Sequence, residues 1–346
     1  MRGESLAAAL AVVLLAASGP AQASCQLSKV AELPVIMNGM APLVNAKVNG
    51  VDARFIADTG AAFSLIKPQL VLKFSLSVNQ GMGRLEGTTG EARAMTGWAQ
   101  DFSVLGGTLH RVEFVLSAPE LGYDSDGLLG ANFLTAYDTE FDLADGDIRF
   151  FRPLLGCDGG GVVYWSSAGA WSELKINPVK SPGRALIAEV LVNGVKLRAQ
   201  FDTGAVMSVI KLEAARRAGL TPDMPGAVAV RGGRGVSGTA VGAWLAPVKS
   251  FELGPEKIAD THMRIAPLTL NDIDMLIGAD FFMTHRVFVA ISQSKVYFTA
   301  DADPAAWTER SAERALLPVF APNEPEDPED APKGEADFDH VIHGDR

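Results

Sequence analysis

Short apolar runs, separated by turn residues, extend over most of the chain. Residues 185–191, 198–201 and 287–291 are examples, because they are rich in the β-branched and aromatic side chains that favour strands. Asn-Gly pairs at 49–50 and 193–194 predict tight hairpin turns. The pattern therefore predicts many short strands joined by hairpins.

Helical periodicity is scarce by comparison. Residues 213–219 predict a short helix that a glycine closes, and residues 304–317 predict another, whose proline suits the first helical turn. We therefore predict an all-β fold with few short helices. Because 48% of the 346 residues are hydrophobic, the chain can bury a core and is long enough for two domains.

The first 23 residues have the layout of a secretory signal peptide. Arg2 supplies the positive start, residues 6–17 are apolar, and Ala21 and Ala23 offer a cleavage site. The apolar run is too short to span a bilayer, and no other uncharged stretch reaches membrane length. We therefore expect an exported protein, periplasmic or extracellular, without a transmembrane segment.

Cys25 and Cys157 are the two cysteines of the chain. In an oxidising compartment we expect a disulfide between them, which ties the mature N-terminus to the middle of the chain. Two other interpretations stay open, namely two unpaired thiols or a lipid on Cys25. Gln22 disfavours the lipid, because a lipoprotein signal normally carries a leucine-like residue there.

Most of the net charge of −11 lies at the C-terminus. Residues 321–346 contain nine acidic and two basic residues and so contribute −7. No basic face is visible, which argues against nucleic acid as a partner. Because prolines alternate with acids, we expect residues 318–346 to form a disordered acidic tail. A solvated terminus is the simpler interpretation of this tail, and an arm for a partner is the alternative.

The chain contains an internal repeat. Residues 48–67 and 192–211 are identical at 12 of 20 positions, at an offset of 144, and both include Asp-Thr-Gly-Ala. Farther along, residues 126–133 match residues 274–281 at an offset of 148, and both include an apolar-apolar-Gly sequence. The same order of features therefore occurs twice.

The repeat predicts two β-rich lobes that together form one unit. Four extra residues in the second copy fall around the short helix predicted at 213–219. The expected segments are a signal peptide 1–23, an N-terminal lobe 24–150, a connector 151–181, a C-terminal lobe 182–300, a short helix 301–317 and the acidic tail 318–346.

Two Asp-Thr-Gly sequences in matching contexts indicate a pair of carboxyl groups. Asp58 and Asp202 each follow a predicted strand, and pseudo-twofold symmetry would bring them to one axis. Two carboxyl groups at such a short distance share one proton. One group can then take a proton from water while the other donates its proton to a carbonyl oxygen. This chemistry hydrolyses peptide bonds without a metal. A single Asp-Thr-Gly is more simply a turn, but two matched copies favour the pair.

The residues beside the aspartates suit this interpretation. Gly60 and Gly204 allow the backbone to approach the carboxyl groups, and their amides can donate to them. Thr59 and Thr203 can hydrogen-bond across the axis and hold the two loops rigid. The apolar-apolar-Gly sequence of each copy can pack beneath the loops.

With these paired motifs, residues 30–300 resemble the retropepsin/pepsin superfamily of aspartic proteases, and most closely the bacterial secreted members with two fused retropepsin-like repeats. The resemblance implies a bilobal acid-protease fold of two β-barrel lobes, which is a monomer with an internal pseudo-dimer. It also implies that Asp58 and Asp202 are the catalytic pair, that the substrate is a peptide or protein, and that neither a cofactor nor a metal is needed.

Members of this superfamily cover the substrate with a glycine-containing hairpin, the flap. The resemblance places two flaps at residues 82–97 and 230–243. Residues 233–238 also match a dinucleotide-binding glycine pattern, but that pattern needs a following helix, whereas residues 239–253 predict a strand. The candidate substrate-binding residues of the flaps are Gly87, Gly90, Gly235 and Gly238.

Metal sites have little support in the sequence. Asp142, Asp145 and Asp147 could suggest calcium, but their spacing differs from that of a calcium loop and favours a hairpin turn. Neither His-Glu-x-x-His nor Cys-x-x-Cys occurs, so a zinc site is not expected.

We therefore expect an exported aspartic endopeptidase whose Asp58/Asp202 pair activates water beneath two flaps. Ala61 and Ala205 follow the motif glycines as in retropepsins, which suggests activity nearer neutral pH. The alternative is a non-catalytic peptide-binding module on the same fold.

Overall fold

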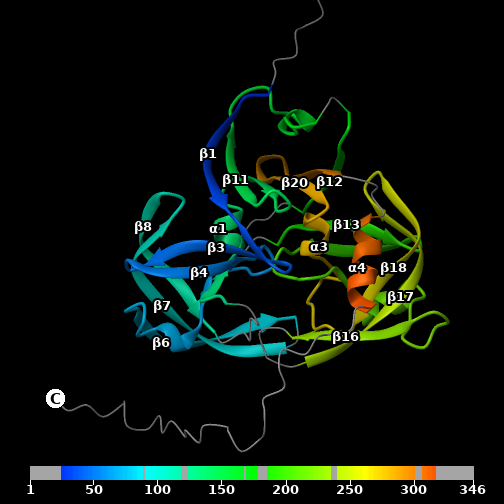
Figure 1. The fold of residues 1–346 in the computed structure, drawn as a ribbon, viewed down its shortest axis with the longest axis horizontal. Coiled ribbons are helices and arrows are strands. Elements are labelled where there is room, and N and C mark those ends of the chain that lie inside the picture. Colours follow the sequence, from blue (N-terminus) through cyan, green and yellow to red (C-terminus); the bar gives the residue numbers. More distant parts are fainter. Residues whose placement is uncertain are drawn as a thin grey trace, which may run out of the picture. The chain divides into compact units, whose positions relative to one another are not determined.

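Two β-barrels, one from each repeat, contain most of the strands (Figure 1). The all-β fold with few short helices is confirmed, and the described residues up to 315 belong to one compact unit. The computed structural model describes residues 25–88, 90–117, 124–166, 169–177, 185–234, 240–300 and 306–316. The predicted signal peptide 1–23 and acidic tail 318–346 lie outside these residues.

The first barrel closes because β3 pairs with both β4 and β7. Asn49 and Gly50 connect β3 to β4 with φ angles of 50° and 80°, as the Asn-Gly hairpin signal predicts. The strands run in the order β2-β3-β4-β9-β5-β8-β7-β6. Their bounds are β2 Ile36–Asn38, β3 Ala41–Val48, β4 Val51–Ala57, β5 Leu65–Ile66, β6 Ser77–Gly87, β7 Gly90–Val104, β8 Gly107–Leu116 and β9 Gly127–Leu129.

The second barrel repeats this connectivity. β13 pairs with β17 to close it, and the parallel pair β14/β19 corresponds to β4/β9 in the first barrel. The helix α2 (Leu212–Arg217) supplies the extra residues of the second copy, at the place predicted for a short helix. The strand bounds are β13 Ile187–Val192, β14 Val195–Phe201, β15 Val209–Lys211, β16 Val228–Arg234, β17 Ala240–Leu253, β18 Glu256–Ala266 and β19 Met275–Ile277.

A six-stranded sheet joins the two halves of the chain, which the repeat did not predict. Its order is β1-β11-β10-β20-β21-β12, so strands of the first half pair with strands of the second. In the β10/β11 hairpin Asp142 pairs with Asp147, which confirms the turn at this position. The strand bounds are β1 Leu27–Pro34, β10 Asp138–Asp142, β11 Asp147–Pro153, β12 Ser172–Lys175, β20 His285–Ala290 and β21 Lys295–Ala300.

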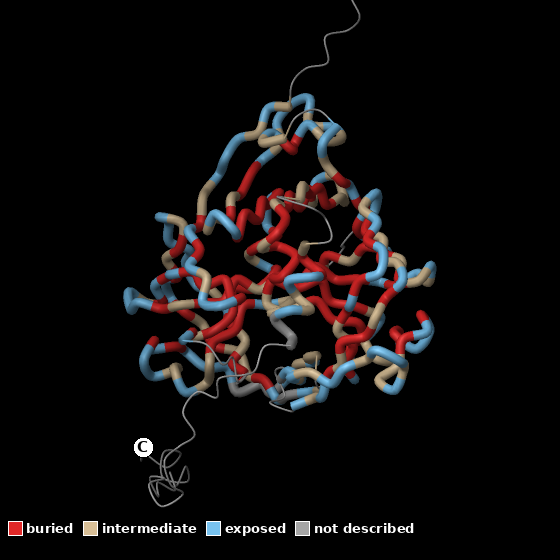
Figure 2. The backbone as a smooth tube through the Cα atoms, turned by 45° about the vertical axis from the view of Figure 1, so that its right-hand side comes forward, coloured by how far each residue is buried: buried red, intermediate tan, exposed pale blue. Residues whose placement is uncertain are grey.

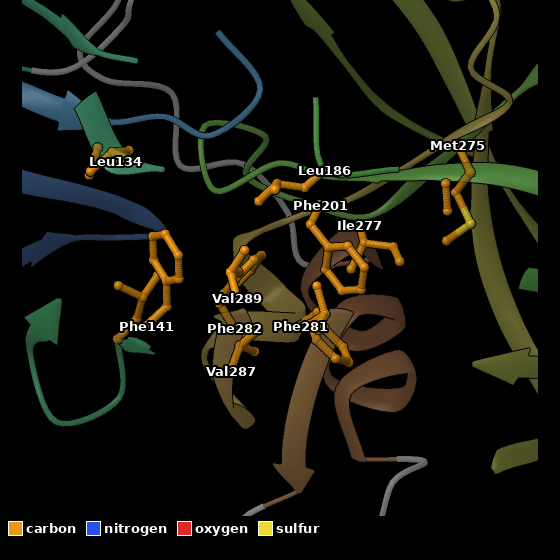
Figure 3. Close-up of a cluster of buried hydrophobic side chains, with 14 of the residues drawn as sticks. Leu134, Phe141, Leu186, Phe201, Met275, Ile277, Phe281, Phe282, Val287 and Val289 are labelled. Carbon is orange, nitrogen blue, oxygen red and sulfur yellow. The ribbon is translucent and has the colours of Figure 1, made fainter. Parts of the chain in front are cut away.

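The hydrophobic core is continuous across both halves. In Figure 2 the buried residues lie mostly toward the centre of the molecule. There the ring of Phe282 lies 5.6 Å from that of Phe141 and 6.2 Å from that of Phe201 (Figure 3). Because aromatic rings bury large apolar areas, this contact between the halves stabilises them as one folding unit.

The remaining helices are short. The helix predicted at 304–317 is confirmed as α4 (Ala306–Leu316). Within the described residues, no helix is both long and apolar enough to cross a membrane. The other helical segments are α1 Ala131–Leu134, α3 Ala279–Phe282 and the 3-10 turns η1 Pro68–Leu70, η2 Gly159–Val162 and η3 Ile291–Gln293.

A disulfide joins Cys25 to Cys157. Both cysteines pack against a small apolar cluster with Trp165 and Trp171 of the connecting segment. The disulfide therefore attaches the start of the described chain to the segment between the two halves. The lobe and connector boundaries given above stay predictions.

Candidate active site

Asp58 and Asp202 stand at equivalent positions, each one residue beyond a barrel strand. The N–H of Asp58 donates to Leu129 O at 2.9 Å, and the N–H of Asp202 donates to Ile277 O at 2.8 Å. These bonds continue the parallel pairs β4/β9 and β14/β19. The apolar-apolar-Gly sequences therefore fix where each aspartate leaves its strand.

The two aspartate side chains meet. Their carboxyl groups hydrogen-bond to each other, although 144 residues separate them in the sequence. In each loop two backbone N–H groups also donate to the aspartate Oδ1. The donors to Asp58 are Gly60 at 2.8 Å and Ala61 at 2.9 Å, and the donors to Asp202 are Gly204 at 3.0 Å and Ala205 at 3.1 Å.

Thr59 and Thr203 cross-link the two loops. The N–H of each threonine donates to Oγ1 of the other at 3.0 Å. The Thr59 hydroxyl then donates to Phe201 O at 2.9 Å, and the Thr203 hydroxyl donates to Ala57 O at 2.7 Å. Both threonines are 1% exposed, so these reciprocal bonds satisfy groups that water does not reach.

Gly60 and Gly204 permit the approach of the carboxyl groups. A Cβ on Gly60 would overlap the carboxyl group of Asp202, and a Cβ on Gly204 would overlap that of Asp58. Any larger residue would therefore push the two aspartates apart. The close approach requires glycine at both positions.

Burial sets the protonation of the aspartate pair. It raises the pKa of Asp58, and it raises the pKa of Asp202 well above its usual range, because desolvation disfavours the charged form. The charge of Asp58 raises the pKa of Asp202 further. The pair therefore retains one shared proton at a pH where an exposed aspartate has lost its own.

Two serines link the aspartate loops to the glycines of the apolar-apolar-Gly sequences. Ser64 Oγ accepts the N–H of Gly130 at 3.0 Å, and Ser208 Oγ accepts the N–H of Gly278 at 2.9 Å. Sequence reasoning had assigned these serines no role in the site. Their identity in the two copies was the available signal.

Two hairpins lie at the positions predicted for flaps. In the first hairpin, the antiparallel pairing of β6 with β7 extends as far as the pair Gly87 and Gly90. Leu85 of this hairpin and Ala61 beside Asp58 pack against one small apolar cluster of the first barrel. Val230 of the β16/β17 hairpin and Ala205 beside Asp202 pack against its counterpart in the second barrel. The predicted residues Gly235 and Gly238 lie outside the described residues.

The first hairpin also contacts the second half of the chain. The N–H of Thr269 donates to Thr88 O at 2.8 Å, and the Asn271 amide donates to the Glu86 carboxylate. We call these two bonds the latch. Sequence reasoning missed the latch, because Thr269 and Asn271 belong to a loop before β19 that carries no motif.

No group of three or more His, Cys, Asp and Glu residues in the described part of the chain is arranged to hold a metal ion. The polar groups at the site are the two carboxyl groups and the backbone amides that donate to them. Such a site can supply a proton acceptor and a proton donor within one hydrogen-bonded pair.

The family model of aspartyl proteases matches residues 44–133 and 188–281. These segments cover just over half of the chain, and each contains one Asp-Thr-Gly sequence. The chain therefore belongs to the aspartyl protease family, as the two repeats led us to expect. No curated protein matches the chain.

Proposed function

We propose that this protein is an aspartic endopeptidase in which Asp58 and Asp202 activate the attacking water. The observation that carries the proposal is the hydrogen-bonded pair of carboxyl groups, held by four backbone amides and by the threonine cross-link. Burial raises the pKa of both groups, which favours the singly protonated state that this chemistry needs.

Burial raises the pKa of both groups, and that of Asp202 further, so we propose Asp202 as the proton donor and Asp58 as the proton acceptor of the first step. Ionised Asp58 takes a proton from water as the water oxygen attacks the peptide carbonyl carbon. Protonated Asp202 donates its proton to the carbonyl oxygen, which gives a tetrahedral diol. In the second step Asp58 donates its proton to the peptide nitrogen while Asp202 takes a proton from a diol hydroxyl. The C–N bond breaks, a carboxylic acid and an amine leave, and the pair returns to its starting protonation.

The surroundings support an extended peptide as substrate. Leu85 and Val230 are partly buried on the two hairpins, and each packs with a cluster that also contacts an alanine beside an aspartate. Paired apolar surfaces on both sides of a scissile bond suit apolar side chains, and hairpin backbones can hydrogen-bond to an extended chain. We therefore propose cleavage between apolar residues.

The test is cleavage of a peptide library by the purified protein lacking residues 1–23. Asp58→Asn and Asp202→Asn should each abolish turnover while peptide binding by calorimetry is retained. Asp145→Asn, at an exposed turn, is the matched control and should cleave normally. Undiminished cleavage by Asp58→Asn would refute the mechanism. Binding without cleavage by the unmodified protein would favour the peptide-binding module.

We also infer export, with removal of residues 1–23. The disulfide between Cys25 and Cys157 supports it, because such bonds persist in oxidising compartments. N-terminal sequencing of the protein from cell fractions tests this inference. A cytosolic protein that begins at Met1 would contradict it.

A further inference from the structure

The helix α4 packs on the second barrel, against β17 and β18 (Figure 1). Trp307 is 1% exposed, and its ring lies 5.6 Å from that of Phe251 and 5.5 Å from that of Phe281. The hydroxyls of Thr261 and Thr308 hydrogen-bond at 2.7 Å. These contacts hold one face of α4 against the barrel wall.

One turn farther along α4, Ser311 reaches a buried carboxylate. Its hydroxyl donates to Oδ2 of Asp280, which is 4% exposed. The other oxygen, Oδ1, accepts the Ser208 N–H at 2.9 Å, the Ser208 hydroxyl at 2.8 Å and the Phe281 N–H at 3.0 Å. A buried carboxylate needs such donors, because an unpartnered oxygen costs the desolvation energy of a charged group.

Asp280 is connected to Asp202 through the loop between them. Ser208 Oγ accepts the N–H of Gly278, and the N–H of Ala279 donates to Ala205 O at 2.7 Å. Ala205 in turn donates its own N–H to Asp202 Oδ1 at 3.1 Å. A continuous series of hydrogen bonds and short loop segments therefore extends from α4 to the carboxyl group of Asp202.

The first half of the chain is built differently at this point. Asn132 occupies the position equivalent to Asp280, and its Oδ1 accepts the Ser64 hydroxyl at 3.1 Å. An amide is neutral, so its burial demands less of its partners. In the described part of residues 25–166, the helical segments have three or four residues each, whereas α4 has 11. The acidic residue Asp280 and the long helix thus occur together, in the half that carries Asp202.

We propose that Ser311 is a positioning residue for Asp202 and acts through Asp280 and Ser208. The inference rests on the proposed function, in which Asp202 is the proton donor. The hydroxyl of Ser311 donates to Asp280, whereas Leu85 and Val230 of the two hairpins pack against other apolar clusters, so we expect Ser311 to act on the orientation of the proton donor. Its loss therefore changes the rate of the chemical step.

The experiment compares Ser311→Ala, Ser311→Thr and Thr308→Val in the full mature chain. Ser311→Ala should lower kcat about tenfold, the size of one hydrogen bond to a charged group, with KM unchanged. Ser311→Thr keeps the hydroxyl and should restore kcat. Thr308→Val removes the bond to Thr261 and should lower the melting temperature without lowering kcat.

A second pair of variants tests the route through Asp280. Asp280→Asn copies the first half of the chain, so Ser311→Ala in that background should lower kcat by less than about twofold. A kcat of Ser311→Ala equal to that of the unmodified protein, or an equal fall in Thr308→Val, would overturn the inference.

An NMR measurement separates this inference from the proposed function. The carboxyl carbon shift of Asp202 reports its protonation and hydrogen bonding without any turnover. It should move in Ser311→Ala and stay in place in Thr308→Val, and an unmoved resonance in Ser311→Ala would overturn the inference. Absence of cleavage by the unmodified protein would refute the proposed function alone, since the Asp202 resonance still decides the role of Ser311.

Discussion

The carboxyl groups of Asp58 and Asp202 would repel each other if both were ionised. Two carboxyl groups lie within hydrogen-bond distance in a site where Asp202 is only 6% exposed. Four backbone amides compensate by donating hydrogen bonds to the carboxyl groups, and the threonine cross-link holds the two loops together. Retention of one proton removes the remaining repulsion, so the protonation of this pair is coupled to folding.

Asp202→Asn should therefore change how stability depends on pH. The pKa of Asp202 is higher in the folded protein than in the unfolded chain, so between these two values the folded state binds more protons. Stability of the unmodified protein falls as pH rises through this window, and asparagine removes that part of the fall. Urea unfolding should give the free energy of unfolding of both proteins at pH 4 and pH 7. The value for Asp202→Asn, relative to that of the unmodified protein, should be higher at pH 7 than at pH 4.

Asp145→Asn serves as the control for the loss of one negative charge at an exposed position. Its stability difference from the unmodified protein should vary little between the two pH values. If the difference for Asp202→Asn were equally constant, the raised pKa of Asp202 would be contradicted.

At the scale of elements, the first of the two hairpins is tied to the opposite half of the chain. The β6/β7 hairpin is bound to the second half of the chain through Glu86 and Thr88, which form the latch with Asn271 and Thr269. We expect the latch to hold this hairpin against the second half of the chain. The backbone bond of the latch survives side-chain replacement, so the Asn271 amide is the part that mutation can remove.

Asn271→Ala should loosen the hairpin. Because the bond to Glu86 is exposed, its loss is worth about 1 kcal/mol or less, which raises KM by up to about fivefold and leaves kcat unchanged. Amide hydrogen exchange of residues 83–88 should become faster. Asp272→Asn, at the next position of the same loop, is the control, and unchanged exchange in Asn271→Ala would show that the latch does not hold the hairpin.

At the scale of the whole molecule, the six-stranded sheet and the disulfide hold the two halves and the segment between them together. Val287 of β20 pairs with Phe141 of β10, across the junction of the halves. The disulfide fixes the connecting segment near one face of this sheet, where Trp165 packs with Phe288. The two barrels are therefore parts of one folding unit.

Replacement of both cysteines by serine should destabilise this unit. The disulfide closes a separation of 132 residues, and removing such a link typically costs about 2–4 kcal/mol, because the unfolded chain gains freedom. Guanidinium unfolding of the double variant should show a lower midpoint. The unmodified protein with a reducing agent should match it, and an unchanged midpoint in both would contradict a stabilising role.

The local and repeated features of the chain were open to sequence reasoning. Short runs of β-branched and aromatic residues between turn residues determine the strands, and Asn49-Gly50 adopts its hairpin because asparagine and glycine tolerate positive φ. The repeated Asp-Thr-Gly identifies Asp58 and Asp202, because the same chemistry stands in the same context twice. These properties follow from the local sequence and from its repetition along the chain.

Contacts between distant segments had no such signal. The sheet shared by both halves, the latch at Asn271 and the support of Asp280 by Ser311 join residues through tertiary packing. Neither their spacing nor their residue types mark them, because a hydrogen bond between distant segments depends on where the barrels place them. The sequence by itself therefore determined the strands, the repeat and the aspartate pair. The tertiary structure decided which residues hold that pair in position.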